Sequence, residues 1–311
     1  MNKPQMITGK TSLVGLIGWP LGHSLSPWMH NSAFIELGLD WAYVPLPVQP
    51  DQVEPALKGL AALSFVGVNV TVPHKQAVMR YMDELSDAAR ITGAVNTIHI
   101  RDGKFFGYNT DAIGFLNSLL EVGCNPKGMR VAILGAGGAA RAVVFALGRA
   151  GVGSVVVLNR TVERAAFLVD DLDELFPSSA LTFETLTDEA LAALNDSVDL
   201  VINTTSVGMY PHVDASPWPA EVPIPPKAAF CDLVYNPLET AFLARARAAG
   251  VAVIDGLGML VHQGAYAFET WTGQKAPIEV MRQACLSKLK AVNNDLLLAD
   301  TQVRYSLSGP A

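Results

Sequence analysis

Polar side chains capable of acid–base chemistry and hydrogen bonding interrupt otherwise apolar segments in the first third of the chain. Residues 67–75, GVNVTVPHK, predict a strand that ends in a turn at Pro73 and brings Thr71 and Lys75 to its carboxyl end. Open α/β sheets bind ligands at that edge. A lysine ammonium there could transfer a proton to a bound ligand, although a lone lysine is usually a solvated surface group.

Two further segments contribute amides and a carboxylate. Residues 93–97, GAVNT, carry Asn96, and residues 107–111, GYNTD, carry Asn109 and Asp111. Asp111 could instead cap a helix that begins immediately after it. Taken alone, the lysine and the aspartate are better explained by these ordinary structural roles than by a binding site.

Two serines form a third polar element. Ser24 and Ser26 are two residues apart, so an extended chain would place both hydroxyls on one face. Pro27 suits the first position of a helix and makes Ser26 the predicted N-cap. Hydroxyls beside a helix N-terminus could bind a carboxylate. Plain capping by Ser26, with Ser24 incidental, explains the segment equally well.

A glycine-rich turn indicates a dinucleotide site. GAGGAA follows an apolar strand and opens a helix, which is the context that the G-x-G-x-x-A pattern requires. The first glycine permits a tight turn, and the second lets the backbone approach a pyrophosphate at the helix N-terminus. The residues assigned to this loop are Gly135, Ala136, Gly137, Gly138 and Ala139. A glycine turn that binds nothing is the alternative, and the flanking strands and helix weigh against it.

The end of the next strand predicts NADP as the dinucleotide. NAD sites usually place Asp or Glu there to bind the ribose 2′-hydroxyl. Here the strand is followed by Asn159, Arg160 and Thr161, with Arg164 one helical turn further on. No acid would repel a 2′-phosphate, and two guanidinium groups could bind it. Their position outweighs the alternative that both arginines are ordinary surface residues.

The elements that would position these residues alternate between apolar strands and amphipathic helices, which predicts an α/β protein with mainly parallel sheet. Besides the strand that precedes the glycine loop, predicted strands lie at residues 13–17, 42–46, 66–70, 154–158, 200–203, 229–233 and 251–255. Predicted helices include residues 27–37, 53–63, 112–123, 259–271 and 278–290.

We expect two α/β domains with a cleft between them. Residues 1–110 plus 256–291 would form a substrate-binding domain, and residues 111–255 a Rossmann-type NADP-binding domain. Residues 292–311 lose their periodicity and are predicted to be a flexible tail.

Composition disfavours several other classes of protein. The chain has 311 residues, of which 50% are hydrophobic and 16% charged, as in compact globular proteins of two domains. A net charge of −7 without a basic block argues against nucleic acid or an anionic membrane as a partner.

The cysteines and the hydrophobic segments set further expectations. Three scattered cysteines suggest neither disulfides nor a zinc site, and no metal is expected. Without an apolar signal region at the N-terminus or a membrane-spanning segment, a cytoplasmic location is expected. The oligomeric state stays open, a homodimer included.

Taken together, these segments resemble the shikimate dehydrogenase family. Between about Leu13 and Lys290 the family's motifs stand in family order as HSLSPWMHN, GVNVTVPHK, GAVNT, YNTD, GAGGAARA, NRTVERA, NTTSVGM, DLVYNP and GLGMLVHQGAYAFETWTG. The resemblance implies reversible, NADP-dependent reduction of 3-dehydroshikimate to shikimate in the biosynthesis of chorismate and the aromatic amino acids.

The resemblance also implies roles for individual residues. Ser24, Ser26 and Tyr235 would hold the carboxylate region of shikimate, and Lys75 with Asp111 would form the catalytic pair. The residues implied around the ring hydroxyls are Thr71, Lys75, Asn96, Asp111 and Gln263. The residues implied around NADP are Gly135–Ala139 and Asn159–Arg164, with Leu233 and Gly256 near the nicotinamide; the family often has methionine at the position of Leu233.

Two alternatives remain. A quinate/shikimate dehydrogenase that uses NAD has the same fold, and Arg160 and Thr161 speak against it. A regulator that senses NADP without catalysis belongs to a different class, and it would have no reason to keep Lys75 and Asp111 among ring-binding groups.

Overall fold

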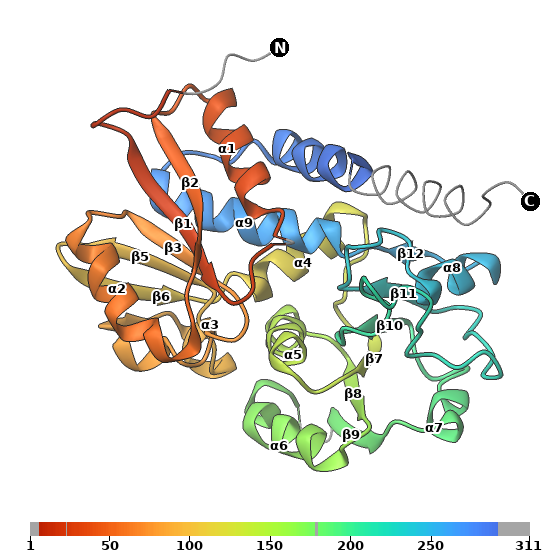
Figure 1. The fold of residues 1–311 in the computed structure, drawn as a ribbon. Coiled ribbons are helices and arrows are strands. Elements are labelled where there is room, and N and C mark those ends of the chain that lie inside the picture. The colour runs from red at the N-terminus through yellow and green to blue at the C-terminus, as the bar shows by residue number, and fades with distance from the viewer. Residues whose placement is uncertain (1–5, 23, 178–179, 292–311) are drawn as a thin grey trace, which may run out of the picture.

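Two β-sheets, each covered by helices on both faces, make up the molecule (Figure 1). The structure is a computed structural model and describes residues 6–22, 24–177 and 180–291. In these residues each sheet has six strands. The expected class, two α/β units with a Rossmann-type second unit, is confirmed. The predicted tail lies outside the described residues.

The first sheet belongs to the part of the chain that was predicted to bind the substrate. Its strand order is β2-β1-β3-β5-β6-β4. The bounds are β1 (Ser12–Gly18), β2 (Trp41–Pro47), β3 (Gly67–Val70), β4 (Glu84–Leu85), β5 (Thr97–Arg101) and β6 (Lys104–Tyr108). One face packs against α1 (Ser26–Glu36), α9 (Leu257–Thr272) and helical residues 278–291; the other packs against α2 (Val53–Ala62) and α3 (Asp87–Thr92).

An antiparallel hairpin departs from the mainly parallel sheet that we expected here. Strands β5 and β6 pair through Asp102 and Gly103, whose φ angles of 51° and 73° lie in the left-handed region. Asp-Gly between alternating segments is a strong hairpin signal, because both residues tolerate positive φ. The hairpin matters for the site, since Asn96 lies just before β5 and Asp111 just after β6.

The second sheet is entirely parallel, with the order β12-β11-β10-β7-β8-β9. Its strands are β7 (Arg130–Leu134), β8 (Ser154–Asn159), β9 (Leu181–Thr185), β10 (Leu200–Asn203), β11 (Ala229–Asp232) and β12 (Val253–Ile254). The strand order reverses between β7 and β10, which is where doubly wound sheets bind dinucleotides.

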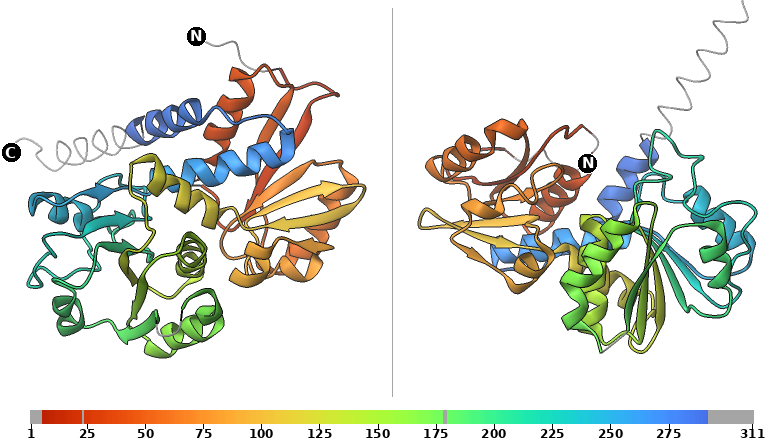
Figure 2. Two further views of the ribbon diagram at one scale, coloured as in Figure 1. Left: turned by 180° about the vertical axis from the view of Figure 1, so that it is seen from behind. Right: turned by 90° about the horizontal axis from the view of Figure 1, so that it is seen from below.

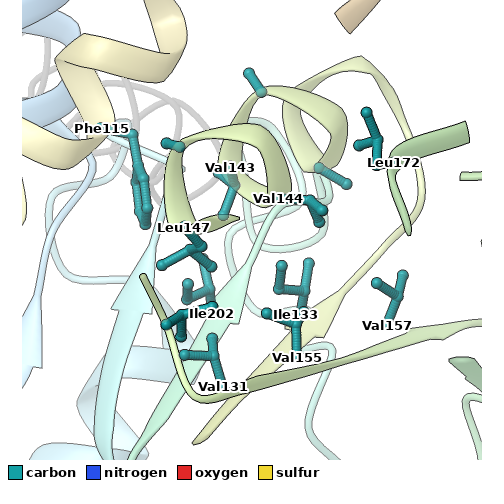
Figure 3. Close-up of a cluster of buried hydrophobic side chains, with 14 of the residues drawn as sticks. Phe115, Val131, Ile133, Val143, Val144, Leu147, Val155, Val157, Leu172 and Ile202 are labelled. Carbon is teal, nitrogen blue, oxygen red and sulfur yellow. The ribbon is translucent and has the colours of Figure 1, made fainter. Parts of the chain in front are cut away.

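Aliphatic side chains hold the helices of this unit on the sheet. One face is covered by α4 (Asp111–Glu121), α5 (Gly138–Ala150) and α6 (Val162–Leu172), and the other by α7 (Asp188–Ala193) and α8 (Ala241–Ala248). In Figure 3, Val143 and Leu147 of α5 point onto Ile133 and Val155 of the sheet, and all four are buried. This packing fixes the start of α5 at the sheet's carboxyl edge.

Two edge strands differ from the sequence prediction. Strand β9 was not predicted: it is a short edge strand, and four of its five side chains are exposed. Strand β12 has two residues where 251–255 had been expected, because it pairs only with two residues of β11.

Helices α4 and α9 pack against each other between the two sheets (Figures 1 and 2). Glycine permits this approach: a Cβ atom added at Gly114 would lie 2.6 Å from the backbone nitrogen of Gln263. One added at Gly258 would lie 3.0 Å from the Cβ of Ser118. The crossing therefore sets Gln263 beside the helix that begins at Asp111. In the described ranges, no helix has the length and apolar character needed to cross a membrane.

Candidate active site

A cavity of about 430 Å³ lies between the two sheets. It is lined by all eight residues that the sequence assigned to the substrate, namely Ser24, Ser26, Thr71, Lys75, Asn96, Asp111, Tyr235 and Gln263. From the cofactor set it is lined by Ala139, Leu233 and Gly256. Positions up to 239 residues apart in the sequence, from Ser24 to Gln263, thus share one cavity.

Lys75 and Asp111 form an ion pair in this cavity. The Lys75 Nζ lies 2.6 Å from Asp111 Oδ2, and the two side chains are 30% and 14% exposed. The other carboxylate oxygen, Oδ1, accepts a hydrogen bond of 2.8 Å from the Asn96 amide. The two oxygens therefore have different partners, which fixes the carboxylate and directs it at the ammonium. Lys75 keeps part of its surface open to the cavity.

Asn96 is itself held by the residue next to Asp111. Its side-chain carbonyl accepts from the Thr110 backbone N–H at 2.8 Å, and its amide donates to the Thr110 hydroxyl at 2.9 Å. The Asp111 backbone N–H donates to the Asn109 side chain at 3.1 Å. Asp111 is the first residue of α4. Its side chain accepts hydrogen bonds from Lys75 and Asn96 and does not cap the helix.

Asn69 is a buried polar residue of the site that the sequence analysis missed. Its side-chain carbonyl accepts from the Tyr43 hydroxyl at 2.8 Å, and its amide donates to the Thr97 hydroxyl at 3.0 Å. Burial raises the pKa of Tyr43 far above its usual value, so the phenol stays a donor. Asn69 lies two residues before Thr71 in an extended segment, and this spacing could have predicted a shared face.

The two serines line the cavity, but the predicted capping is wrong. Helix α1 begins at Ser26, the preceding Leu25 occupies the cap position, and no side chain caps the helix. The Ser24 hydroxyl accepts the Ser26 backbone N–H at 3.3 Å. Pro27 falls at the second helical position, where a missing N–H costs no intrahelical bond. Neither serine hydroxyl is therefore used as an N-cap.

Tyr235 contributes a third hydroxyl to the cavity. Burial raises the pKa of its phenol, which keeps it protonated and able to donate. Across the part of the chain that the structure describes, its hydroxyl forms no hydrogen bond in this state of the site. Three hydroxyl donors, from Ser24, Ser26 and Tyr235, thus border one cavity.

The glycine loop has the shape that a pyrophosphate requires. Gly135 has a φ of +106°, and an added Cβ would lie 2.8 Å from the Thr205 side chain, so only glycine fits there. Cβ atoms added at Gly137 or Gly138 would meet no atom within 4 Å. The backbone at the start of α5 therefore borders open space, into which a phosphate can approach its N–H groups.

The tip of β8 presents its arginines to solvent. The strand ends at Asn159, and Arg160, Thr161 and Arg164 are exposed. Considering residues 6–22, 24–177 and 180–291, neither arginine forms an ion pair or a side-chain hydrogen bond. Two exposed guanidinium groups, one just before α6 (Val162–Leu172) and one in its first turn, could bind a 2′-phosphate.

Leu233 and Gly256 connect the cavity to the cofactor side. A Cβ added at Gly256 would lie 2.4 Å from the Leu233 carbonyl oxygen, so the two segments are in backbone contact. Met209 and Met259, which the sequence analysis left unassigned, line the same region. Met209 follows β10 within the NTTSVGM motif, and that position at a carboxyl edge was the available signal.

The Lys75–Asp111 acid–base pair thus lines the same cavity as Ala139 of the dinucleotide loop. This arrangement defines the class of two-domain, dinucleotide-dependent α/β oxidoreductases. Three family descriptions match the chain: "Shikimate dehydrogenase substrate binding domain" over residues 16–98, "Shikimate / quinate 5-dehydrogenase" over 120–210, and "Shikimate 5'-dehydrogenase C-terminal domain" over 256–286. The chain belongs to the shikimate dehydrogenase family.

Individual relatives support this assignment. A protein of Methanopyrus kandleri named shikimate dehydrogenase (NADP(+)) is 47% identical over 91% of this chain and 98% of its own length. A Thermus thermophilus shikimate 5-dehydrogenase, solved with NADP(H) and shikimate, is 40% identical with a TM-score of 0.80, covering 89% of this chain and 99% of its own. A quinate dehydrogenase from Corynebacterium glutamicum, solved with NAD, is 32% identical with a TM-score of 0.82, covering 89% and 99%.

Proposed function

We propose that this protein catalyses the reversible, NADP-dependent reduction of 3-dehydroshikimate to shikimate. The observation that carries the proposal is the Lys75–Asp111 ion pair inside a cavity that is also lined by Ala139 of the glycine loop. Membership of the family supplies the substrate, and the residues at the tip of β8 favour NADP over NAD.

The chemistry requires a proton at the substrate oxygen. When bound, NADPH supplies the hydride that reduces the ketone carbon. The carbonyl oxygen then gains negative charge, and the Lys75 ammonium donates a proton to it, which yields the alcohol. In the reverse direction, the neutral Lys75 amine accepts the hydroxyl proton. Asp111 orients Lys75 throughout and stabilises its charged form.

The remaining cavity residues would hold the substrate. Ser24, Ser26 and Tyr235 offer hydroxyl hydrogens, which suit the carboxylate of shikimate. Thr71, Asn96 and Gln263 would surround the ring hydroxyls. The Gln263 amide donates one hydrogen to the Leu260 carbonyl at 2.7 Å, which holds the side chain and leaves its carbonyl oxygen and second hydrogen for the ligand.

We further propose that the two parts of the chain divide this work. Residues 1–110 with 256–291 would bind the substrate, and residues 111–255 would bind NADP. The division places Lys75 in one part and Asp111 in the other, so the catalytic pair itself spans the boundary.

Replacing Ser24 with alanine is expected to raise the KM for shikimate and to lower kcat much less. A hydrogen bond to a charged group contributes about 1.5–3 kcal/mol, so roughly a tenfold rise in KM is expected. The carboxylate does not change during the reaction, and the serine therefore binds the ground and transition states alike. Steady-state kinetics with saturating NADP measures both constants. A fall in kcat with unchanged KM would show that Ser24 acts on the reacting centre instead.

Replacing Gly137 with alanine is expected to weaken NADP binding about tenfold, because the methyl group would occupy the space of the pyrophosphate and displace its charge-assisted hydrogen bonds. The folded protein should tolerate the change, since no atom lies within 4 Å of the added Cβ. Fluorescence titration with NADP measures the affinity, and a thermal melt measures the stability of the folded protein. Gly59→Ala is the matched control. A Cβ added at Gly59, which lies on α2, would also meet no atom within 4 Å, and the change should leave NADP affinity unchanged.

An assay of the purified protein with shikimate or quinate, each paired with NADP or NAD, tests the proposed function. We expect reduction of NADP by shikimate to be the fastest of the four reactions. Faster turnover of quinate with NAD would support the quinate/shikimate alternative. Binding of NADP without turnover of either substrate would support a sensing role.

A further inference from the structure

Arg141, one turn inside α5, connects the cofactor helix to the other half of the molecule. Its Nε donates to the Thr92 carbonyl at 2.9 Å, and its Nη2 donates to the Ile91 carbonyl at 3.3 Å. Its Nη1 lies 2.8 Å from Asp171 Oδ2 on α6. The side chain is only 15% exposed. Arg141 thus has contacts both within its own unit and across the boundary.

The carbonyls that Arg141 binds end α3, where the helix leaves its last C=O groups without helical partners. Gly93 closes this helix with a φ of +66°. Three residues further lies Asn96, whose amide binds Asp111. Between them, the Val95 backbone N–H donates to the Lys75 carbonyl at 2.8 Å. The end of α3 therefore leads directly into the backbone and side chain that support both members of the catalytic pair.

A second route joins the same helix end to Asp111. The Thr92 hydroxyl accepts from the Asn109 amide at 2.9 Å. The Asn109 side-chain carbonyl accepts the Asp111 backbone N–H at 3.1 Å. Thr92 and Asn109 are buried, so water does not compete for the hydrogen bond between their side chains.

Through its backbone, Arg141 contacts the glycine loop. Its backbone N–H donates to the Gly137 carbonyl at 3.1 Å, at the turn where a pyrophosphate would approach. Arg141 therefore connects the two segments, since its backbone contacts the turn that would bind the dinucleotide and its guanidinium binds the end of α3.

We propose that Arg141 is a positioning residue that sets the distance between the nicotinamide and the substrate carbon by fixing α5 against the end of α3. This inference rests on the proposed function. Arg141 lines neither the cavity nor the open space at Gly137, so it contributes to alignment and not to binding of either ligand alone. A misplacement of about 1 Å can cost on the order of 10²-fold in rate, so alignment is a large effect.

The test compares Arg141→Met with Arg130→Met. Arg130 also holds one carboxylate, Asp199, and one backbone carbonyl, that of Asp196, but all its contacts lie within the NADP-binding unit. Both variants lose an arginine and its ion pair. Only Arg141→Met removes bonds across the boundary, so Arg130→Met controls for loss of stability.

For Arg141→Met we expect kcat to fall about tenfold, within the range that misalignment produces. The Kd for NADP and the KM for shikimate should stay close to those of the unchanged protein. The primary isotope effect on kcat should rise because hydride transfer becomes slower than other steps; it is measured for reduction of 3-dehydroshikimate with NADPH deuterated at the transferred position. Arg141→Lys, which keeps a cation but only one donor centre, should recover part of kcat. Equal kcat and isotope effect in Arg141→Met and Arg130→Met would overturn the inference.

Amide hydrogen exchange of the free protein gives a readout that does not depend on turnover. Peptides covering residues 90–97 should exchange faster in Arg141→Met than in the unchanged protein. In Arg130→Met their exchange rate should stay the same. If the unchanged protein turns over no shikimate, the proposed function fails, and exchange still decides whether Arg141 couples the two segments. Unchanged exchange in both variants would refute that coupling. Should Arg141→Met fail to fold, Arg141→Lys takes its place in both measurements.

Discussion

Replacing Lys75 with alanine is expected to lower kcat at least about a hundredfold, since general acid–base help contributes typically 10²- to 10⁴-fold. The Lys75 Nζ is held 2.6 Å from Asp111, which directs one ammonium at the cavity. Its charge matters most when the substrate oxygen becomes an alkoxide, so its contribution is larger in the transition state than in the bound ketone. The KM for shikimate should therefore change much less than kcat. Steady-state kinetics at saturating NADP separates the two constants.

Lys58→Ala is the matched control for this variant. Lys58 also pairs with a carboxylate, Glu54, at 2.7 Å, but on the exposed surface of α2. Its removal should leave kcat unchanged. If Lys75→Ala retains a near-normal kcat and only KM rises, Lys75 binds the substrate and does not transfer the proton.

Asp111→Asn should also lower kcat steeply, because the variant keeps the shape of the side chain and loses the charge that orients Lys75. Asn96 would still find a hydrogen-bond partner at Oδ1, so the local fold should survive. Since Lys75 and Asp111 act as a unit, the double variant should be little worse than the poorer single one. Multiplicative losses would instead show that the two residues act independently.

Strand direction made part of the site predictable from the sequence. Thr71 and Lys75 come directly after β3 of the first sheet, and the glycine loop comes directly after β7 of the second sheet. Each segment therefore lies at the carboxyl edge of its own sheet, where α/β proteins bind ligands, whereas the meeting of the two edges at one cavity depends on how the sheets pack together. Gln263 was reachable only through the family resemblance, because nothing in its own helix distinguishes it from a surface glutamine.

The supporting interactions were less predictable because they depend on tertiary contacts. The capping role predicted for Ser26 is wrong because α1 begins one residue earlier than expected, at Ser26 itself. Helix ends are the least certain part of such a prediction. The bond between Tyr43 and Asn69 joins two strands whose pairing no local pattern specifies. Arg141 falls inside the GAGGAARA motif, but its partners on α3 lie 49 and 50 residues earlier.

Replacing Arg160 with aspartate is expected to erode or reverse the preference for NADP over NAD. A charge-assisted contact with the 2′-phosphate contributes about 1.5–3 kcal/mol, so its loss should cost roughly ten- to a hundredfold in kcat/KM for NADP. The new carboxylate would also repel the phosphate. For NAD, it could accept a hydrogen bond from the ribose 2′-hydroxyl, as acidic residues at this position do.

Lys127→Asp separates this local effect from the change in total charge. Lys127 precedes β7, at the opposite edge of the parallel sheet from the tip of β8, and it is exposed. The substitution changes the net charge by the same amount as Arg160→Asp and should leave the cofactor preference intact. Kinetic efficiency with each cofactor at saturating shikimate is the measurement. A pair of guanidinium groups in contact with the 2′-phosphate must favour NADP. Equal kinetic efficiency with NADP and NAD in the unchanged protein would therefore show that Arg160 and Arg164 are surface residues without a role in cofactor choice.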